Sequence, residues 1–459
     1  MIKKSDHTVQ LVDFIVKTDF QDLPEDVIDF IKRDILDTLA IALGGSSSQG
    51  CPEIVDMVRG WGGNQQSTIL VHGGKCPAPM AASANSVMSR ALDMGDTHPE
   101  AAHIGEYELF PLLAMAEMNG GVTGREFLTA YALGFEAACR IGAAAHAVSA
   151  GLPNGRHPCI GPFGSTAAIA RLLDMDAEST GNALGIHYVV SGCWDMQMYD
   201  EGTLMIRAHH GFTAEDAINA VLMAQRGITG PKNIFSGKNN FFARLFPWNN
   251  DPDLLIDDLG KHWEMLNTML KPYASCKFTH TSIDGIIDLV KEHHIQPEDI
   301  GGITCTLCHQ GNVVIEPRDV RWNPKTMPEC QFSLPYTVAT GAIKQKVFLD
   351  DYEPQEITRT DVRDLMGKIE ASTDDQLPLW AAEVKAVLSN GEEYSKRVEH
   401  ARGGPEVPLT WDDLEQKFHG CARYAAKPIP TSNLEQAVDM IRHLEDSNNA
   451  SHIMELLTP

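Results

Sequence analysis

The chain has 459 residues, of which 43% are hydrophobic and 22% charged, the composition of a globular protein large enough for two or three domains. Its formal net charge of -25 would repel nucleic acid and anionic membranes, so we expect neither as a partner. A small anionic substrate is compatible with this charge, because a local basic pocket dominates within a Debye length of roughly 8 Å.

The N-terminal segment "MIKKSDHTVQ" lacks the apolar stretch of a secretory signal. No apolar run approaches the roughly 20 residues that a membrane-spanning helix needs. Ten cysteines in so long a chain are then typical of reduced thiols and not of a disulfide framework. These features predict a cytoplasmic protein without a membrane partner.

Helical periodicity dominates the chain up to about residue 267. Apolar side chains recur at helical spacing between Pro24, which suits a first helical turn, and Gly44, which suits a helix end. Thr123 and Glu126 have the spacing of a capping box at the start of a further helix. Other helices are predicted over residues 80–92, 162–176, 177–190 and 213–227.

The pattern changes after Leu270. Residues 301–311 and 381–398 alternate as strands do, and Asn390 with Gly391 forms a hairpin-turn signal in the second segment. Helices are predicted over residues 281–294 and 333–343, and again from 410 onward. We therefore predict a mainly α fold: a large all-helical domain, residues 1–267 plus 398–459, and a smaller α+β lid domain, residues 268–397, inserted before the C-terminal helices.

One cysteine motif resembles a cofactor site. The run "CTLCH" at 305–309 matches the attachment pattern of c-type haem, but the export signal that this chemistry requires is missing. Ile303, Cys305 and Leu307 instead alternate as one face of a strand, which favours a structural role. No second ligand pair follows at zinc-finger spacing, and GxSxG and HExxH motifs are absent. These residues therefore favour neither a haem site nor a zinc site.

Four short segments gather the residues that could carry chemistry. They are "ALDMGDTHPEAAH" at 91–103, "NGRHPCIGPFGS" at 154–165, "MIRAHHG" at 205–211 and "LKPYASCKFTH" at 270–280. The second and third are expected just before helices, whose N-terminal ends favour anions. All four are rich in Lys, Arg or His in an acidic protein, so we predict that they converge on one pocket between helical domain and lid.

Two kinds of site are compatible with these residues. Asp93, His98 and His103 are possible metal ligands, but the cations Arg207 and Lys271 would repel a divalent ion nearby. Arginine and lysine hold carboxylates, and imidazoles with pKa values near neutrality remove and return protons. The pattern favours acid–base chemistry without a metal on a small carboxylate substrate.

The same segments resemble the MmgE/PrpD family, which includes 2-methylcitrate dehydratase, cis-aconitate decarboxylase and iminodisuccinate epimerase. The resemblance covers nearly the whole chain and also rests on "ALGIHYVVSG", "AQRGITGPKNIFSG" and "QFSLPYTVA", which occur in the family's order. It implies a large helical domain with a smaller α+β lid, a homodimer, and activity without a cofactor.

The resemblance also implies site residues. Matched position by position, the family's catalytic residues correspond to Asp93, Thr97, His103, His157 and Lys271. We expect substrate binding by Arg207, His209, Tyr273, Cys276 and Lys277. Either His103 or His157 would be the base and the other the acid, while Asp93 would orient an imidazole.

Two positions and one segment depart from the family's pattern. Ile206 stands where relatives often carry Lys, and Cys276 stands where decarboxylase-like members carry His. Residues 104–110 replace a proline-containing run and add Glu106 and Glu108, which would suit the amine of an imino-dicarboxylate. These departures argue against the tricarboxylate-specific activities and leave acid–base chemistry in place.

The sequence therefore predicts a lyase, a dehydratase or a decarboxylase, that moves a proton at a carbon next to a carboxylate. An epimerase of an imino- or amino-dicarboxylate is the first alternative. A carboxylate-binding member of the fold that has lost catalysis is the second. Retention of the five family positions favours an enzyme, whereas Ile206 favours binding alone.

Overall fold

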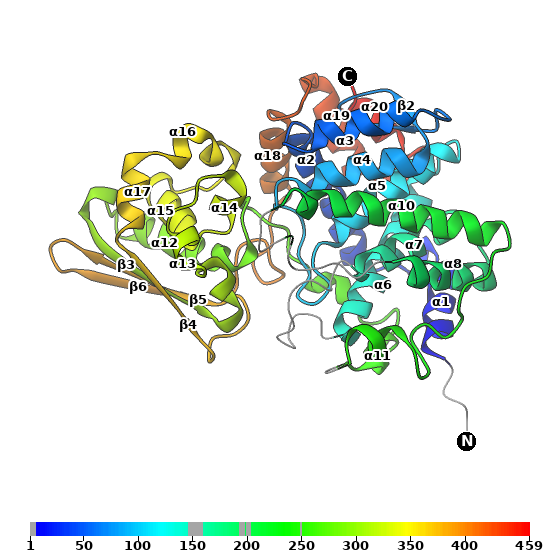
Figure 1. Cartoon of the computed structure of the whole chain (residues 1–459), viewed down its shortest axis with the longest axis horizontal. Helices are drawn as coiled ribbons and strands as arrows, with labels where there is room; N and C mark the ends of the chain where they lie inside the picture. Colours follow the sequence, from blue (N-terminus) through cyan, green and yellow to red (C-terminus); the bar gives the residue numbers. More distant parts are fainter. Residues whose placement is uncertain (1–5, 146–158, 192–197, 199–202, 248–249) are drawn as a thin grey trace. The chain divides into compact units, whose positions relative to one another are not determined.

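The computed structural model describes residues 6–145, 159–191, 198, 203–247 and 250–459, which belong to two compact units (Figure 1). The larger unit comprises Met1–Thr268 and Thr410–Pro459, and the smaller one comprises Met269–Leu409. The sequence-based division ends the lid at residue 397, whereas residues 398–409 belong to the smaller unit here. A backbone hydrogen bond of 2.9 Å from Leu270 to the carbonyl of Gly403 holds this segment.

The larger unit consists mostly of helices, which confirms the prediction of a mainly α fold. They are α1 (His7–Lys17), α2 (Glu25–Gly45), α3 (Cys51–Trp61), α4 (Ala78–Arg90), α5 (Ile104–Met118), α6 (Gly124–Ala145), α7 (Gly161–Leu172), α8 (Ala177–Val190), α10 (Met205–Gln225), α11 (Phe241–Leu245), α18 (Trp411–Ala422), α19 (Thr431–Arg442) and α20 (His452–Leu456). A short antiparallel pair joins β1 (Ser67–Thr68) to β2 (Lys75–Cys76). Within the described residues, no helix has both the length and the apolar character needed to cross a membrane.

Small residues let the central helices of the larger unit approach closely. Helix α4 packs against both α5 and α10 (Figure 1). On α10, a Cβ at Gly211 would lie 2.6 Å from Ser83 Oγ on α4. On α7, a Cβ at Gly164 would lie 1.7 Å from Glu108 Oε1 on α5. This packing buries α5 continuously from its first residue to Ala116.

The helix starts show where local sequence signals suffice. The predicted capping box is confirmed, since the backbone N–H of Thr123 donates to Glu126 Oε2 at 2.8 Å and that of Glu126 donates to Thr123 Oγ1 at 3.3 Å. We expected the cluster at 205–211 to precede a helix, but α10 begins at Met205 and includes it. That prediction was wrong. The sequence has no signal for a helix start at this point, because Leu204 has no side chain that can cap the helix.

The smaller unit is an α+β domain built on a four-stranded sheet in the order β4-β3-β5-β6 (Figure 1). Strand β3 is parallel to β4 and antiparallel to β5. The strands are β3 (Ile300–Cys308), β4 (Ile369–Asp374), β5 (Ala382–Leu388) and β6 (Glu393–Val398). The helices are α12 (His280–Glu292), α13 (Arg318–Arg321), α14 (Met327–Gln331), α15 (Leu334–Lys344), α16 (Pro354–Ile357) and α17 (Thr360–Met366). Helix α12 packs on β5, β6 and α15.

Strand β3 and the β5–β6 hairpin confirm the two predicted strand segments. On β3, Ile303, Cys305 and Leu307 are all buried, so Cys305 and Leu307 of the "CTLCH" run are part of the sheet core. Strand β4 was not predicted, because Ile369 is the one buried residue among its six. A mostly exposed strand has no apolar alternation to reveal it.

Candidate active site

The segment 91–103 forms a tight loop between α4 and α5. His98 and Ala102 pair through two backbone hydrogen bonds of 2.8 and 3.1 Å. The His98 ring lies inside this turn, where Nδ1 accepts hydrogen bonds from the N–H groups of Glu100 and Ala101 at 3.2 and 3.1 Å. The His98 ring therefore supports the loop itself.

His103 ends this loop with one ring nitrogen bound to the backbone. Its Nδ1 lies 2.7 Å from the carbonyl oxygen of Asp96 and 3.4 Å from Thr97 Oγ1. A carbonyl oxygen can only accept a hydrogen bond, so Nδ1 carries the proton and Nε2 holds the lone pair of the neutral ring. Because the His103 side chain is only partly buried, Nε2 is the basic nitrogen that the loop offers.

Asp93 is held by a buried chain of charged groups. Arg90 Nη1 donates to Asp93 Oδ1 at 2.7 Å, and Arg90 Nε lies 3.6 Å from Glu106 Oε2. The same oxygen of Glu106 lies 3.5 Å from His210 Nε2. Asp93 also has a φ of 49°, a left-handed conformation that is uncommon outside glycine. The loop geometry and the Arg90 contact together fix the direction of the Asp93 carboxylate.

Arg207 adds positive charge to the same part of the larger unit. It lies in the first turn of α10, directly after the partly buried Ile206, and its Nη1 donates to Gln49 O at 2.6 Å. Burial lowers the pKa of Arg207, and the neighbouring charge of Arg90 lowers it further. A guanidinium keeps its proton at any physiological pH, so Arg207 remains a cation suited to a carboxylate.

His209 is fully buried, and both of its ring nitrogens have partners within the protein. Nδ1 lies 3.0 Å from the carbonyl oxygen of Met205, and Nε2 lies 3.3 Å from Tyr107 Oη. The carbonyl again places the proton on Nδ1, so Nε2 accepts from the tyrosine hydroxyl. These contacts hold α10 against α5, and substrate binding by His209 stays a prediction.

A group of fully buried carboxyl groups surrounds the start of α5. This acid cluster consists of Asp34, Asp37, Asp96, Glu106 and Glu108. Burial raises the pKa of Asp34 to about 8, against the hydrogen bond of 2.6 Å that Tyr131 Oη donates to it. Burial, and then the charge of Asp34, raise the pKa of Asp96 well above its ordinary value. Part of the cluster is therefore protonated at neutral pH.

The acid cluster supports the site loop directly. The carboxylate of Asp96 accepts from the backbone N–H groups of Ile104 and Gly105 at 2.7 and 3.1 Å, at the first turn of α5. Lys417 Nζ lies 2.6 Å from Asp37 Oδ1 and donates to the carbonyl of Met94 at 2.7 Å. The loop that carries Asp93, Thr97 and His103 is thus tied to the core at both ends.

Glu106 and Glu108 are buried on α5. We expected them to suit a substrate amine, but both side chains are fully buried. The carboxyl of Glu108 fills space against Gly164 on α7, and that of Glu106 lies against Arg90 and His210. Both carboxyl groups thus pack inside the larger unit, and their contact with a substrate amine stays a prediction.

The fourth predicted segment opens the smaller unit and places Lys271, Tyr273, Cys276 and Lys277 there. Tyr273 Oη donates to Asp284 Oδ1 at 2.6 Å, and Lys277 Nζ lies 4.3 Å from the ring centroid of Trp380. Lys271 is 1% exposed and Lys277 is 6% exposed. Two lysines are therefore buried near one another in this unit.

The structure places the predicted site residues in two groups. Asp93, Thr97, His103 and Arg207 belong to the larger unit, and Lys271 and Lys277 belong to the smaller one. His157 lies outside the described residues. A single cleft lined by both groups stays a prediction.

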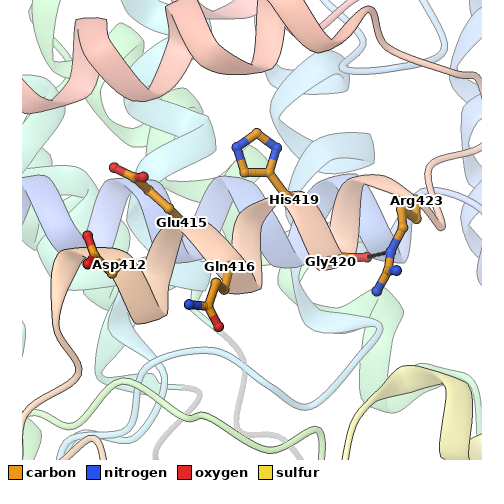
Figure 2. A pocket seen from close by; sticks show the side chains of 6 residues that line it. All are labelled: Asp412, Glu415, Gln416, His419, Gly420 and Arg423. Atoms are coloured by element: carbon orange, nitrogen blue, oxygen red, sulfur yellow. Dashed lines mark hydrogen bonds between the residues drawn. The ribbon is translucent and has the colours of Figure 1, made fainter.

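Two other possible sites do not compete with this loop. Along α18, a hollow of about 530 Å³ is lined by Asp412, Glu415, Gln416, His419, Gly420 and Arg423 (Figure 2). The lining residues belong to α18 or, for Arg423, directly follow it, and none of them belongs to the predicted set. Across the residues that the structure describes, no group of three or more His, Cys, Asp or Glu side chains is arranged to hold a metal ion.

Comparison with known proteins agrees with the sequence resemblance. The model of the MmgE/PrpD N-terminal domain matches residues 9–252, and that of the MmgE/PrpD C-terminal domain matches residues 273–442. A cis-aconitate decarboxylase-like protein, oryM, of Aspergillus oryzae is 25% identical over 98% of this chain and 97% of its own length. Cis-aconitate decarboxylase of Homo sapiens is 25% identical over 95% of this chain and 91% of its own. Cis-aconitate decarboxylase of Aspergillus terreus is 24% identical over 95% of this chain and 92% of its own.

Proposed function

The protein belongs to the MmgE/PrpD family, and we propose that it is a decarboxylase or dehydratase of a small di- or tricarboxylate. Both reactions pass through negative charge on a carbon next to a carboxylate, so both need a positioned base and nearby cations. A carboxylate substrate is supported by the relatives that match nearly the whole chain, which are cis-aconitate decarboxylases and a cis-aconitate decarboxylase-like protein.

The observation that carries the proposal is the hydrogen bond from His103 Nδ1 to the carbonyl of Asp96, at 2.7 Å. It fixes the tautomer, so Nε2 is the nitrogen that exchanges a proton with the substrate. When Nε2 gains a proton, Nδ1–H keeps its bond to the carbonyl, and the ring does not need to move. His157, matched from the family, serves as the second acid–base group in this proposal.

Cationic groups hold the substrate in the same proposal. Arg207 and Lys271 bind its carboxylates and stabilise the enediolate charge that develops in the transition state. Asp93, oriented by Arg90 at 2.7 Å, balances the charge of an imidazolium. Ile206 supplies no charge where relatives often carry Lys, which favours a substrate with an apolar group or one fewer carboxylate at that point.

The two alternatives are weaker than the lyase. The epimerase rested on Glu106 and Glu108 as partners of an amine, and both are buried in the core. A binding protein without catalysis does not need a fixed imidazole tautomer on a loop that is anchored at both ends.

A substrate panel tests the proposal. Purified protein is incubated with cis-aconitate, 2-methylcitrate and iminodisuccinate, and release of CO₂, formation or loss of the alkene and change in optical rotation are followed. We expect one of the first two acids, or a close analogue, to lose CO₂ or water. Inversion of iminodisuccinate without either product would replace the lyase with an epimerase. Tight binding without turnover of any acid would support the binding protein.

A further inference from the structure

Lys277 is a buried lysine with an unusual environment in the smaller unit. It begins a short 3-10 helix, Lys277–Thr279, directly before α12. Its Nζ lies 4.3 Å from the ring centroid of Trp380, over the face of the indole. The backbone of Trp380 is itself fixed, because its backbone N–H donates to Cys308 Sγ at 3.3 Å and its carbonyl accepts from Thr281 Oγ1 at 2.7 Å. The amine is therefore held against a rigid aromatic surface.

No carboxylate in the described part of the chain pairs with Lys277. The nearest acids that act on it electrostatically, Asp284 and Glu406, have other partners. Asp284 accepts from Tyr273 Oη at 2.6 Å and from the backbone N–H of Arg402 at 2.9 Å. Glu406 lies 3.4 Å from His400. Among the described residues, the Lys277 amine makes a cation–π contact with the Trp380 indole and no ion pair with a carboxylate.

Two other buried lysines, Lys32 and Lys417, are paired with carboxylates. Lys32 lies 2.9 Å from Glu445, and Lys417 lies 2.6 Å from Asp37. Burial without such a partner disfavours an ammonium ion, and a second cation nearby adds to that cost. Accordingly burial, and then the charge of Lys271, lower the pKa of Lys277 to about 7.

We propose that Lys277, with Lys271 beside it and Trp380 beneath it, is a carboxylate-binding subsite in which the bound carboxylate draws a proton onto the Lys277 amine. The proton comes from solvent, and the amine and the anion become an ion pair without any covalent change. This inference rests on the proposed function only in taking the carboxylate to be that of the substrate. The groups that set the titration are Lys271 before the 3-10 helix, Asp284 on α12, Glu406 after β6, and Trp380 between β4 and β5.

The proposal predicts that anion affinity depends on pH. With a pKa of about 7, roughly one-tenth of the Lys277 amine is charged at pH 8 and about nine-tenths at pH 6. Binding that requires the ammonium is therefore about tenfold weaker at pH 8 than at pH 6. Each bound anion takes up close to one proton at pH 8 and about a tenth of a proton at pH 6.

Calorimetric titration with tricarballylate, a saturated tricarboxylate, tests this on the full-length protein. Titrations at pH 8 in two buffers of different ionisation enthalpy give the number of protons taken up. We expect about one proton for wild type, and no proton uptake at this site for Lys277→Arg, whose charge is permanent. Lys277→Met should bind more weakly and also lose the uptake. Lys346→Arg, at an exposed lysine 2.6 Å from Asp350, is the matched control and should behave as wild type.

The outcomes separate this inference from the proposed function. Wild type that takes up no proton, or Lys277→Arg that takes up as much as wild type, contradicts the role of Lys277. Proton uptake through Lys277 without turnover of any acid would instead support the carboxylate-binding subsite and contradict the proposed lyase activity. If Lys277→Arg does not fold, Lys277→Met and the wild-type proton count still decide the question.

Discussion

The two units both bury groups of like charge, and they accommodate them differently. In the larger unit, neighbouring side chains bind two members of the acid cluster, since Asp37 pairs with Lys417 and Asp34 accepts a hydrogen bond from Tyr131. The remaining charge is reduced by protonation, because burial raises the pKa of Asp34 to about 8. In the smaller unit, Lys271 and Lys277 are buried close enough for one charge to lower the pKa of the other.

This difference separates the acid cluster, which supports the fold, from the Lys271 and Lys277 pair, which we propose binds a ligand. The acid cluster anchors the site loop through the hydrogen bond that Asp96 accepts from Ile104 and through Lys417, which pairs with Asp37 and donates to the Met94 carbonyl. Lys277 has an aromatic surface and no carboxylate among the described residues, so a ligand would supply what the fold does not. Substitutions that disrupt the acid cluster should therefore reduce stability, whereas substitutions of Lys277 should reduce ligand binding.

The largest expected effect is on the loop that the acid cluster supports. His103→Gln removes the basic Nε2 while keeping a group able to donate to the Asp96 carbonyl. We predict a fall in kcat of about 10²–10⁴-fold, the usual contribution of a general base, with an unchanged melting temperature. Steady-state kinetics and a thermal melt check this, with His452→Gln, at an exposed position near the C-terminus, as the control. A fall in melting temperature that accounts for the lost activity would make His103 structural.

Lys417→Met should produce the largest loss of stability. It removes the cation 2.6 Å from Asp37 and leaves a carboxylate in the acid cluster without this partner. Truncating one partner of a buried pair costs about 3–5 kcal/mol, measured by urea unfolding. The exposed pair Lys346 and Asp350 is the contrast, since Lys346→Met should cost less than about 1 kcal/mol. Equal losses for the two variants would mean that the acid cluster does not depend on Lys417.

Glu108→Gln should change how stability varies with pH. Burial, and then the charge of Asp34, raise the pKa of Glu108 well above its ordinary value. A carboxyl whose pKa is higher in the folded than in the unfolded protein binds more protons when folded, so stability falls as the pH rises above about 4.5. The neutral glutamine removes this contribution. We predict that the variant gains stability relative to wild type as the pH rises from 5 to 8, by up to about 1.4 kcal/mol per pH unit in urea unfolding. Parallel curves for the two proteins would contradict the raised pKa.

The smallest effect is expected for the stability of Lys277→Met. The methionine keeps most of the side-chain length and removes an amine that has no carboxylate partner. Because an unpaired buried charge is costly, we predict a change between zero and about 1 kcal/mol in the stabilising direction. A urea titration of the unliganded protein measures it. A loss of several kcal/mol would show that Lys277 has a structural partner, and the contrast between the two units would disappear.

Local sequence signals predicted the parts of the fold that local chemistry decides. The capping box at Thr123 and Glu126, the apolar alternation of β3 and the Asn390-Gly391 turn all lie within a few residues of what they determine. The start of α10 and strand β4 lack such signals, and both were missed.

For the same reason, the sequence could indicate only the local part of the candidate site, whose catalytic role stays a prediction. Asp93, Thr97 and His103 are close in the chain, and the structure gathers them on one loop. The acid cluster was not foreseen, because Asp37 meets Lys417 from the other end of the sequence. The partner of Lys277 is likewise remote, since Trp380 belongs to the connection between β4 and β5. Contacts of this kind have no sequence spacing by which to recognise them.

Proton exchange with solvent at a carbon next to a carboxylate tests the central claim most directly. The substrate found in the panel is incubated in D₂O with wild type and with His103→Gln, and the position and rate of deuterium incorporation are followed by NMR. Wild type should place deuterium on that carbon in the product or in the recovered substrate, and His103→Gln should do so at least about 100-fold more slowly. Turnover that leaves the carbon free of deuterium, or equal rates for the two proteins, would contradict His103 as the group that moves the proton.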